Sequence, residues 1–131
     1  ERVVVMERTN LRHVTPEDTG GRFSVVVADL SFISLCTVAP ALARLADDDA
    51  DLVLLIKPQF EAGKGEVGRG GIVRDDDVRR RAVEKALRCL TGEGLTPVGI
   101  VPSPITGADG NREFLAWCRP GADVVELEVP A

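Results

Sequence analysis

Two charged residues stand at the ends of strongly apolar stretches. Asp29 follows the run FSVVVA, and Lys57 follows DLVLLI. Pro58 favours extended backbone at the preceding lysine, which fixes Lys57 at a strand end. If both runs are neighbouring parallel strands, the acid and the amine share one crevice at the edge where such sheets bind ligands. A salt bridge or helix cap at the rim of the sheet is an equally good interpretation of the two residues alone.

A third candidate is the polar stretch NREF at residues 111–114, which follows a glycine-containing loop and contains Glu113. A carboxylate at this point could join the first acid and the lysine. From residue propensity alone, the first turn of a short surface helix is the better interpretation.

Residues 63–68 (GKGEVG) match the pattern G-x-G-x-x-G. A true dinucleotide site turns directly from a strand into a helix, whereas here Gly70 and Gly71 prolong the loop and no helical pattern begins before Asp75. We interpret residues 58–74 as a mobile lid, and a solvated linker is nearly as good an interpretation. The lid offers three side chains suited to phosphate contact, Lys64, Arg69 and Arg74.

The remaining pattern supplies the elements that would position these residues. We expect strands at residues 2–7, 23–29, 51–57, 95–101 and 123–129, helices at 35–46 and 78–90, and a short helical segment within 111–117. The acidic run 47–49 should end the first helix, which tolerates Pro40 only in its first turn. This order predicts an α/β fold with a mostly parallel sheet and helices on both faces. The alternating run 123–129 should be an antiparallel edge strand.

Composition sets the broad class. The chain has 131 residues, 44% hydrophobic and 28% charged, which fits one globular domain without a membrane span. Cysteines 36, 89 and 118 are odd in number and widely spaced, which predicts reduced thiols in the cytoplasm rather than disulfides or a metal site. A net charge of −5 is unusual for a free-standing RNA-binding domain. The chain opens on Glu1 and an apolar run, so we expect that it is cut from a longer protein.

Taken together, these segments resemble the TlyA family of haemolysin-like ribosomal RNA 2′-O-methyltransferases, which share the FtsJ-type catalytic domain. Four stretches carry the resemblance in the expected order: VVMERTNLR (4–12), VVADLSFISL (26–35), LIKPQFEAGKGEVGRGGIVRD (55–75) and SPITGADGNREFL (103–115). The resemblance implies a Rossmann-like, S-adenosylmethionine-dependent methyltransferase fold. It also implies 2′-O-methylation of ribosomal RNA or ribosomal subunits in the cytoplasm.

The family's catalytic set is lysine–aspartate–lysine–glutamate, and Asp29, Lys57 and Glu113 match its last three members. The first lysine, the glycine-rich cofactor loop and the basic S4-like RNA-binding domain have no counterpart here. The resemblance therefore implies that residues 1–131 are the C-terminal part of the methyltransferase domain, truncated at the N-terminus. It implies cofactor contacts from a small set of residues, Glu7, Thr9, Asn10, Asp29 and Leu30.

In this interpretation Lys57 positions the ribose hydroxyl and stabilises the developing alkoxide, because flanking carboxylates favour the charged ammonium. The chain alone should bind S-adenosylmethionine weakly or not at all and be inactive. Exposed strand edges predict a homodimer. Two alternatives stay open: a non-catalytic haemolysin-type or interaction module, and a nucleotide-dependent oxidoreductase using residues 63–68.

Overall fold

The computed structural model describes residues 2–130, apart from the side chain of Ala108. Within this part, the strands β1 (Phe23–Ala28), β2 (Ala46–Ile56), β3 (Leu95–Pro102) and β4 (Phe114–Pro120) form one sheet in the order β1-β2-β4-β3. The helices are α1 (Pro16–Thr19), α2 (Leu35–Leu45) and α3 (Asp76–Gly92). Short 3-10 turns, η1 (Leu11–His13), η2 (Pro58–Phe60), η3 (Arg69–Gly71) and η4 (Ala108–Gly110), lie in the connecting loops.

The sheet is mixed, which corrects the expected mostly parallel arrangement within the α/β class. β1 and β2 are parallel, whereas β4 pairs antiparallel with both β2 and β3. The reason is the connection between β3 and β4, which is a loop without a crossover helix. Such a connection returns the chain in the opposite direction, and β4 enters the sheet between β2 and β3.

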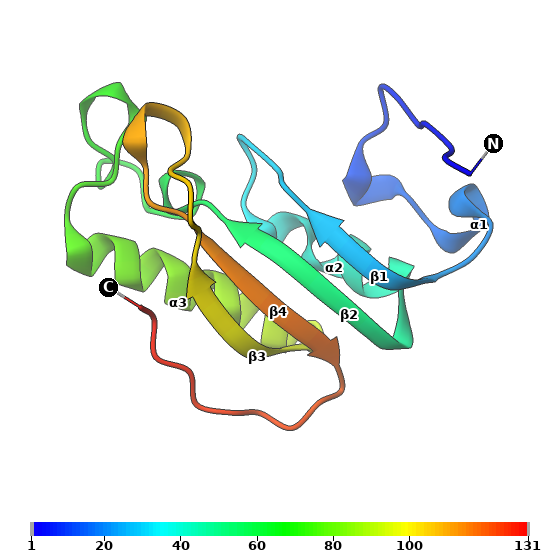
Figure 1. Ribbon diagram of the computed structural model, residues 1–131. Helices are drawn as coiled ribbons and strands as arrows, with labels where there is room; N and C mark the ends of the chain where they lie inside the picture. Colours follow the sequence, from blue (N-terminus) through cyan, green and yellow to red (C-terminus); the bar gives the residue numbers. More distant parts are fainter. Residues whose placement is uncertain (1, 131) are drawn as a thin grey trace.

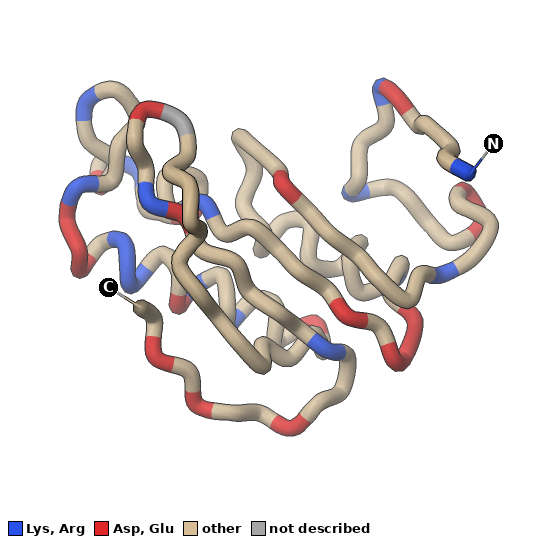
Figure 2. Tube along the Cα trace, in the orientation of Figure 1, with Lys and Arg blue, Asp and Glu red and all other residues tan. Residues whose placement is uncertain are grey.

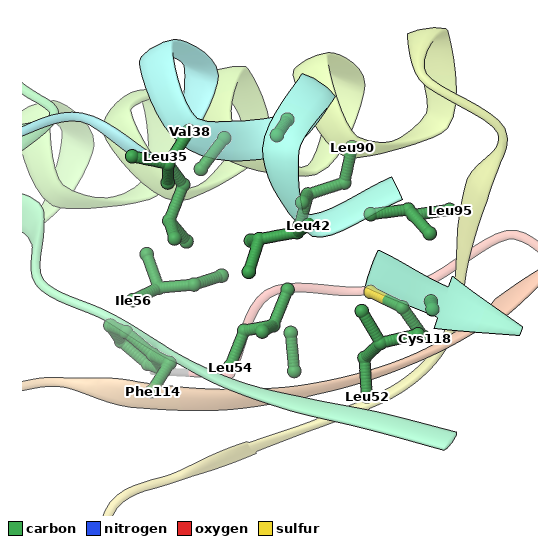
Figure 3. Packing of buried hydrophobic residues seen from close by; sticks show 14 of the residues in the cluster. Leu35, Val38, Leu42, Leu52, Leu54, Ile56, Leu90, Leu95, Phe114 and Cys118 are labelled. Atoms are coloured by element: carbon green, nitrogen blue, oxygen red, sulfur yellow. The ribbon is translucent and has the colours of Figure 1, made fainter. Parts of the chain in front are cut away.

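Both long helices cover the same face of the sheet (Figure 1), so the expectation of helices on both faces is wrong for the described residues. Side chains alternate between faces along a strand. In β2 the residues Leu52, Leu54 and Ile56 therefore point toward the helices and are fully buried. Figure 3 shows them packed against side chains of both helices, among them Leu42 and Leu90.

The opposite face carries exposed apolar side chains. Val25 and Val27 of β1, Val53 of β2 and Trp117 of β4 all lie there. The indole Nε1 of Trp117 donates a hydrogen bond to Asp51. This face of the sheet is thus uncovered by helices in the described part of the chain.

Both predicted long helices are confirmed, and their capping residues explain where they begin. Ser34 accepts from the backbone N–H of Cys36 at the start of α2, and Asp75 accepts from the second and third N–H groups of α3. Pro40 lies in the interior of α2, not in its first turn as expected. Because proline lacks an N–H, the hydrogen bond that residue 40 would donate to the Cys36 carbonyl is absent.

Three predicted elements differ in the structure. Residues 2–7 form no strand, and their valines are exposed, because no neighbouring strand of the described chain pairs with them. Residues 114–117 belong to β4 rather than to a helix, since pairing with two strands outweighs weak local propensity. Residues 123–129 lie outside the sheet. Besides these three elements, the acidic run 47–49 also differs from expectation, because it belongs to β2.

The cysteines also differ from expectation. Cys36 of α2 and Cys89 of α3 form a disulfide that joins the two long helices. Their wide spacing in the sequence concealed this pairing, because the packing of α2 on α3 brings the two residues together. Cys118 is a buried free thiol, and burial raises its pKa to about 12. In residues 2–130 no cluster of His, Cys, Asp and Glu could hold a metal ion, and no helix is long and apolar enough to cross a membrane.

Candidate active site

Asp29 and Lys57 meet at one edge of the sheet. Ala28 pairs with Leu54 in the parallel register of β1 and β2, so the residues after the two strands leave the sheet side by side. The Nζ of Lys57 lies 2.5 Å from Oδ1 of Asp29 and donates to Oγ of Ser31 at 2.9 Å. The lysine side chain is 13% exposed and that of Asp29 is 70% exposed. The amine is thus held inside the edge while its carboxylate partner faces solvent.

The antiparallel register brings Glu113 to the same edge. Ile56, the last residue of β2, pairs with Phe114, the first residue of β4, so Glu113 precedes β4 where Lys57 follows β2. Glu113 is buried, and its Oε2 accepts from Nε2 of Gln59 at 2.8 Å. Its backbone carbonyl accepts from the N–H of Ser103 at 2.8 Å. The carboxylate is therefore fixed from both its side chain and its main chain.

Gly107 makes room for this carboxylate. A Cβ atom built on Gly107 would collide with the carboxyl group of Glu113. The N–H of Gly107 donates to the backbone carbonyl of Asn111 at 2.7 Å, which closes the loop around the acid. A side chain at position 107 would have to displace the Glu113 carboxylate.

One pocket of about 440 Å³ contains all three predicted catalytic residues, Asp29, Lys57 and Glu113. Phe32 and Phe60 line the same pocket, with ring centroids 5.0 Å apart, and Phe32 is 89% exposed. The pocket therefore combines an amine, two carboxylates and an aromatic rim. A separate, more apolar pocket of about 590 Å³ lies between α3 and the C-terminal segment and contains none of the three.

The predicted cofactor residues are divided. Asp29 lines the pocket and Leu30 packs against the core beside it. Glu7, Thr9 and Asn10 are exposed and lie outside the pocket lining. Thr9 donates to the carbonyl of Glu7, and Asn10 caps η1 by accepting from the N–H of Arg12. The structure thus does not bring residues 7, 9 and 10 into the pocket that Asp29 lines.

The predicted phosphate-binding side chains Lys64, Arg69 and Arg74 are all exposed on the segment between η2 and α3. Figure 2 shows basic residues on this segment, next to the loop that leads into β4. Asn111 fastens the two together, because its Oδ1 accepts from the N–H of Val73 at 3.0 Å and its Nδ2 donates to Gly71 at 2.9 Å. The segment is therefore attached to the site at its end, and its three basic side chains lie outside the pocket lining.

Sequence reasoning missed several supporting residues. Ser31 and Gln59 hold Lys57 and Glu113, and each lies two residues after a predicted catalytic residue. Their closeness in sequence to Asp29 and Lys57 was the one feature that could have indicated their supporting role. Gly107 gave no signal, since its role depends on a contact with a side chain six positions away that only the fold creates.

A sequence model of the FtsJ-like methyltransferases matches residues 1–119. The chain belongs to this family. The assignment agrees with the α/β architecture, and the pocket at the strand ends is lined by a lysine and two carboxylates. The methyl donor of such methyltransferases is S-adenosylmethionine.

The chain is similar to one relative named as a ribosomal RNA methyltransferase and to another named as a hemolysin. It is 54% identical over 122 residues to the 16S/23S rRNA (cytidine-2′-O)-methyltransferase TlyA of Mycobacterium tuberculosis, covering 93% of this chain and 46% of the relative. It is 40% identical over 116 residues to Hemolysin A of Brachyspira hyodysenteriae, covering 88% of this chain and 48% of the relative. The chain thus spans about half the length of these relatives.

Solved structures share the fold of this chain. A proposed hemolysin of Streptococcus thermophilus superposes with a TM-score of 0.89 at 39% identity, over 95% of this chain and 45% of that one. The N-methyltransferase NodS of Bradyrhizobium japonicum superposes with a TM-score of 0.52 at 19% identity, over 87% of this chain and 58% of that one. The second likeness extends to the fold alone.

Proposed function

We propose that this chain is the C-terminal part of a cytoplasmic, S-adenosylmethionine-dependent methyltransferase that modifies ribose 2′-hydroxyl groups of ribosomal RNA. Asp29, Lys57 and Glu113 would be its catalytic residues. The observation that carries the proposal is their convergence from three separate segments on one pocket. Similarity to a TlyA methyltransferase over 93% of the chain supports the same substrate class.

In the proposed reaction a bond forms between the ribose oxygen and the methyl carbon, and the bond from that carbon to the sulfonium sulfur breaks. The hydroxyl must lose its proton as the new bond forms, and this proton would pass to solvent water at the open pocket. Lys57 is suited to orient this oxygen and stabilise the negative charge that develops on it, because its ammonium is held in place by Asp29 and Ser31. Glu113, held by Gln59, adds a second carboxylate to the lining of the same pocket.

The residues described do not by themselves enclose the cofactor. Glu7, Thr9 and Asn10 are exposed and apart from the pocket that contains Asp29. A glycine-rich turn from strand to helix, which such folds use to hold a nucleotide, does not occur in residues 2–130. We therefore expect weak or no binding of S-adenosylmethionine by this chain alone, and no methyl transfer without a partner segment that supplies the turn.

Lys64, Arg69 and Arg74 would contact RNA phosphates. Their exposure leaves them free to approach a polyanion, and Asn111 links their segment to the loop that carries Glu113. Phosphate contacts position a nucleic acid without reading its sequence. These side chains would therefore affect RNA affinity rather than the choice of nucleotide.

The chain alone is also proposed to pair with a second copy. β1 is an edge strand of the described sheet, where it pairs with β2 on one side and with no strand on the other. Phe23, Val25 and Val27 expose apolar surface along it. Unprotected edges of this kind favour strand pairing between molecules. Light scattering should give twice the monomer mass, and a monomer at high concentration would contradict the pairing.

The test of the function is methyl transfer to ribosomal subunits by a protein in which this chain is joined to a cofactor-binding half. Radiolabelled S-adenosylmethionine should label ribosomal RNA. The modified linkage should resist alkaline hydrolysis, because a methylated 2′-oxygen cannot attack the adjacent phosphate. Label on a base, or none on RNA, would contradict the proposal, and tight binding of NAD would favour the oxidoreductase alternative.

A further inference from the structure

Glu61 is a buried carboxylate between the two loops that carry the ion pair of the site. The residue is 3% exposed. Oε1 accepts from Oγ of Ser34 at 2.6 Å, and Oε2 accepts from the N–H of Leu35 at 2.8 Å. Both donors belong to the N-terminal end of α2. The carboxylate therefore binds the point where the loop after β1 becomes a helix.

The main chain of Glu61 is anchored on the other side. Its N–H donates to the carbonyl of Pro58 at 3.0 Å, which closes the η2 turn directly after Lys57. Its own carbonyl accepts from Nζ of Lys85 in α3 at 2.6 Å. The position of the carboxylate is thus set by the same turn that begins at the catalytic lysine.

The two loops also touch at the pocket itself. Lys57 contacts Asp29 and Ser31 across the gap, and Phe60 contacts Phe32. These contacts lie on side chains that are partly or largely exposed, whereas the Glu61 contacts lie in the interior. The two buried hydrogen bonds of Glu61 resist displacement of one loop against the other more strongly than contacts that are open to water.

We propose that Glu61 is a positioning residue, which holds the loop after β1 against the loop after β2 so that Asp29 and Ser31 keep the Lys57 ammonium in place. The proposal rests on the proposed function for its catalytic consequence. The structural consequence concerns Lys57 alone. Without the carboxylate, the N-terminal end of α2 loses two hydrogen bonds and the loop containing Asp29 is free to shift.

The structural arm follows the ammonium of Lys57 by nitrogen-15 NMR in the purified chain, with Lys57→Arg to assign the signal. In wild type the ion pair and the Ser31 hydrogen bond should slow proton exchange enough for a resolved signal. Glu61→Ala should lose or broaden it. Glu61→Gln, whose amide oxygen can still accept from Leu35 and whose nitrogen can donate to Ser34, should restore it.

Two further variants make the comparison sharp. Glu66→Ala removes an exposed carboxylate from the same segment. That carboxylate accepts hydrogen bonds from Gly63 and Arg81. Its removal should leave the Lys57 signal unchanged. Glu61→Asp keeps the charge but shortens the side chain, so it cannot reach both donors. It should weaken the signal, and it replaces Glu61→Ala if that variant fails to fold by circular dichroism.

The catalytic arm uses the protein in which this chain is joined to a cofactor-binding half, which we call the methyl-transferring protein. Glu61→Ala should lower kcat by about 10- to 100-fold, as expected for a small misplacement of a catalytic group, with KM for S-adenosylmethionine within about threefold of wild type. Glu61→Gln should recover most of the rate. A folded Glu61→Ala or Glu61→Asp protein with a wild-type Lys57 signal would overturn the proposal, as would a Gln variant as impaired as Ala. Absence of methyl transfer by wild type would instead contradict the proposed function and leave the NMR result intact.

Discussion

Lys57 and Asp29 form an ion pair at the carboxyl ends of two adjacent parallel strands, with Nζ 2.5 Å from Oδ1. The two partners differ in environment, since the lysine is 13% exposed and the aspartate 70% exposed. An ion pair with one open partner contributes little to stability. The ion pair nevertheless holds an amine in the lining of the pocket that Glu113 also lines.

The first prediction concerns Gly107. Gly107→Ala should displace the Glu113 carboxylate, because the added methyl group would collide with it. Overpacking of this kind costs about 1–3 kcal/mol of unfolding free energy. Chemical denaturation measures that loss, and in the methyl-transferring protein the same variant should lower kcat.

Gly92→Ala is the matched control for Gly107. It lies at the end of α3, where an added Cβ would meet nothing within 4 Å. Alanine is favoured over glycine in helices, so this variant should be neutral or slightly stabilising. Equal effects of the two substitutions would show that the contact between Gly107 and Glu113 is unimportant.

The second prediction is a pH dependence at Glu61. Burial raises the pKa of this carboxyl above 4.5, opposed by hydrogen bonds from Ser34 and Leu35 and by the charge of Lys85. Between pH 4.5 and the raised pKa, the Glu61 carboxyl binds more protons in the folded protein than in the unfolded chain. The stability of the folded protein therefore falls as pH rises through this interval. Glu61→Gln cannot ionise, and the unfolding free energy of wild type relative to this variant should decline across that interval and then level off.

Glu66 provides the opposite case for comparison. The N–H of Gly63, followed by the Arg81 side chain, lowers the pKa of this exposed carboxyl. Its stabilising contribution is present above 4.5 and is lost as pH falls through the lowered pKa. The unfolding free energy of wild type relative to Glu66→Gln should therefore rise with pH. Slopes of the same sign for the two pairs would refute the assignment of their environments.

How much of the site was predictable depended on how local its signals were. Asp29 and Lys57 could be predicted because each directly follows an apolar run that forms a strand with an identifiable end. Glu113 was identified through family resemblance, while local propensity favoured a helix there. The antiparallel pairing of β4 with β2 and β3 makes the residues after Glu113 a strand. Such long-range pairing leaves little trace in the local sequence.

The same limit applies to the wider fold. The bounds of α2 and α3 were predicted to within two residues, because their apolar periodicity and caps are local features. The strand predictions at 2–7 and 123–129 were wrong, since an apolar run becomes a strand only where another strand pairs with it. The disulfide was missed for a related reason: Cys36 and Cys89 become neighbours only through helix packing.

The third prediction concerns this disulfide. Closing a loop between cysteines 53 positions apart should stabilise the fold by about 2–4 kcal/mol, mainly by restricting the unfolded chain. Replacing Cys36 and Cys89 with serine should lower the unfolding free energy by that amount. A reductant should lower the melting temperature of wild type and leave the double variant unchanged. Titration of three free thiols in unreduced, denatured protein would contradict the pairing.

The most direct test of the catalytic assignment is Lys57→Ala in the methyl-transferring protein, assayed together with its affinity for S-adenosylmethionine. If Lys57 orients the ribose oxygen and stabilises its charge, methyl transfer to ribosomal RNA should fall by about a thousandfold or more, while the Kd for the cofactor stays within a few-fold of wild type. Turnover by Lys57→Ala at the wild-type rate would contradict the assignment and remove the pocket of Asp29, Lys57 and Glu113 from the chemistry.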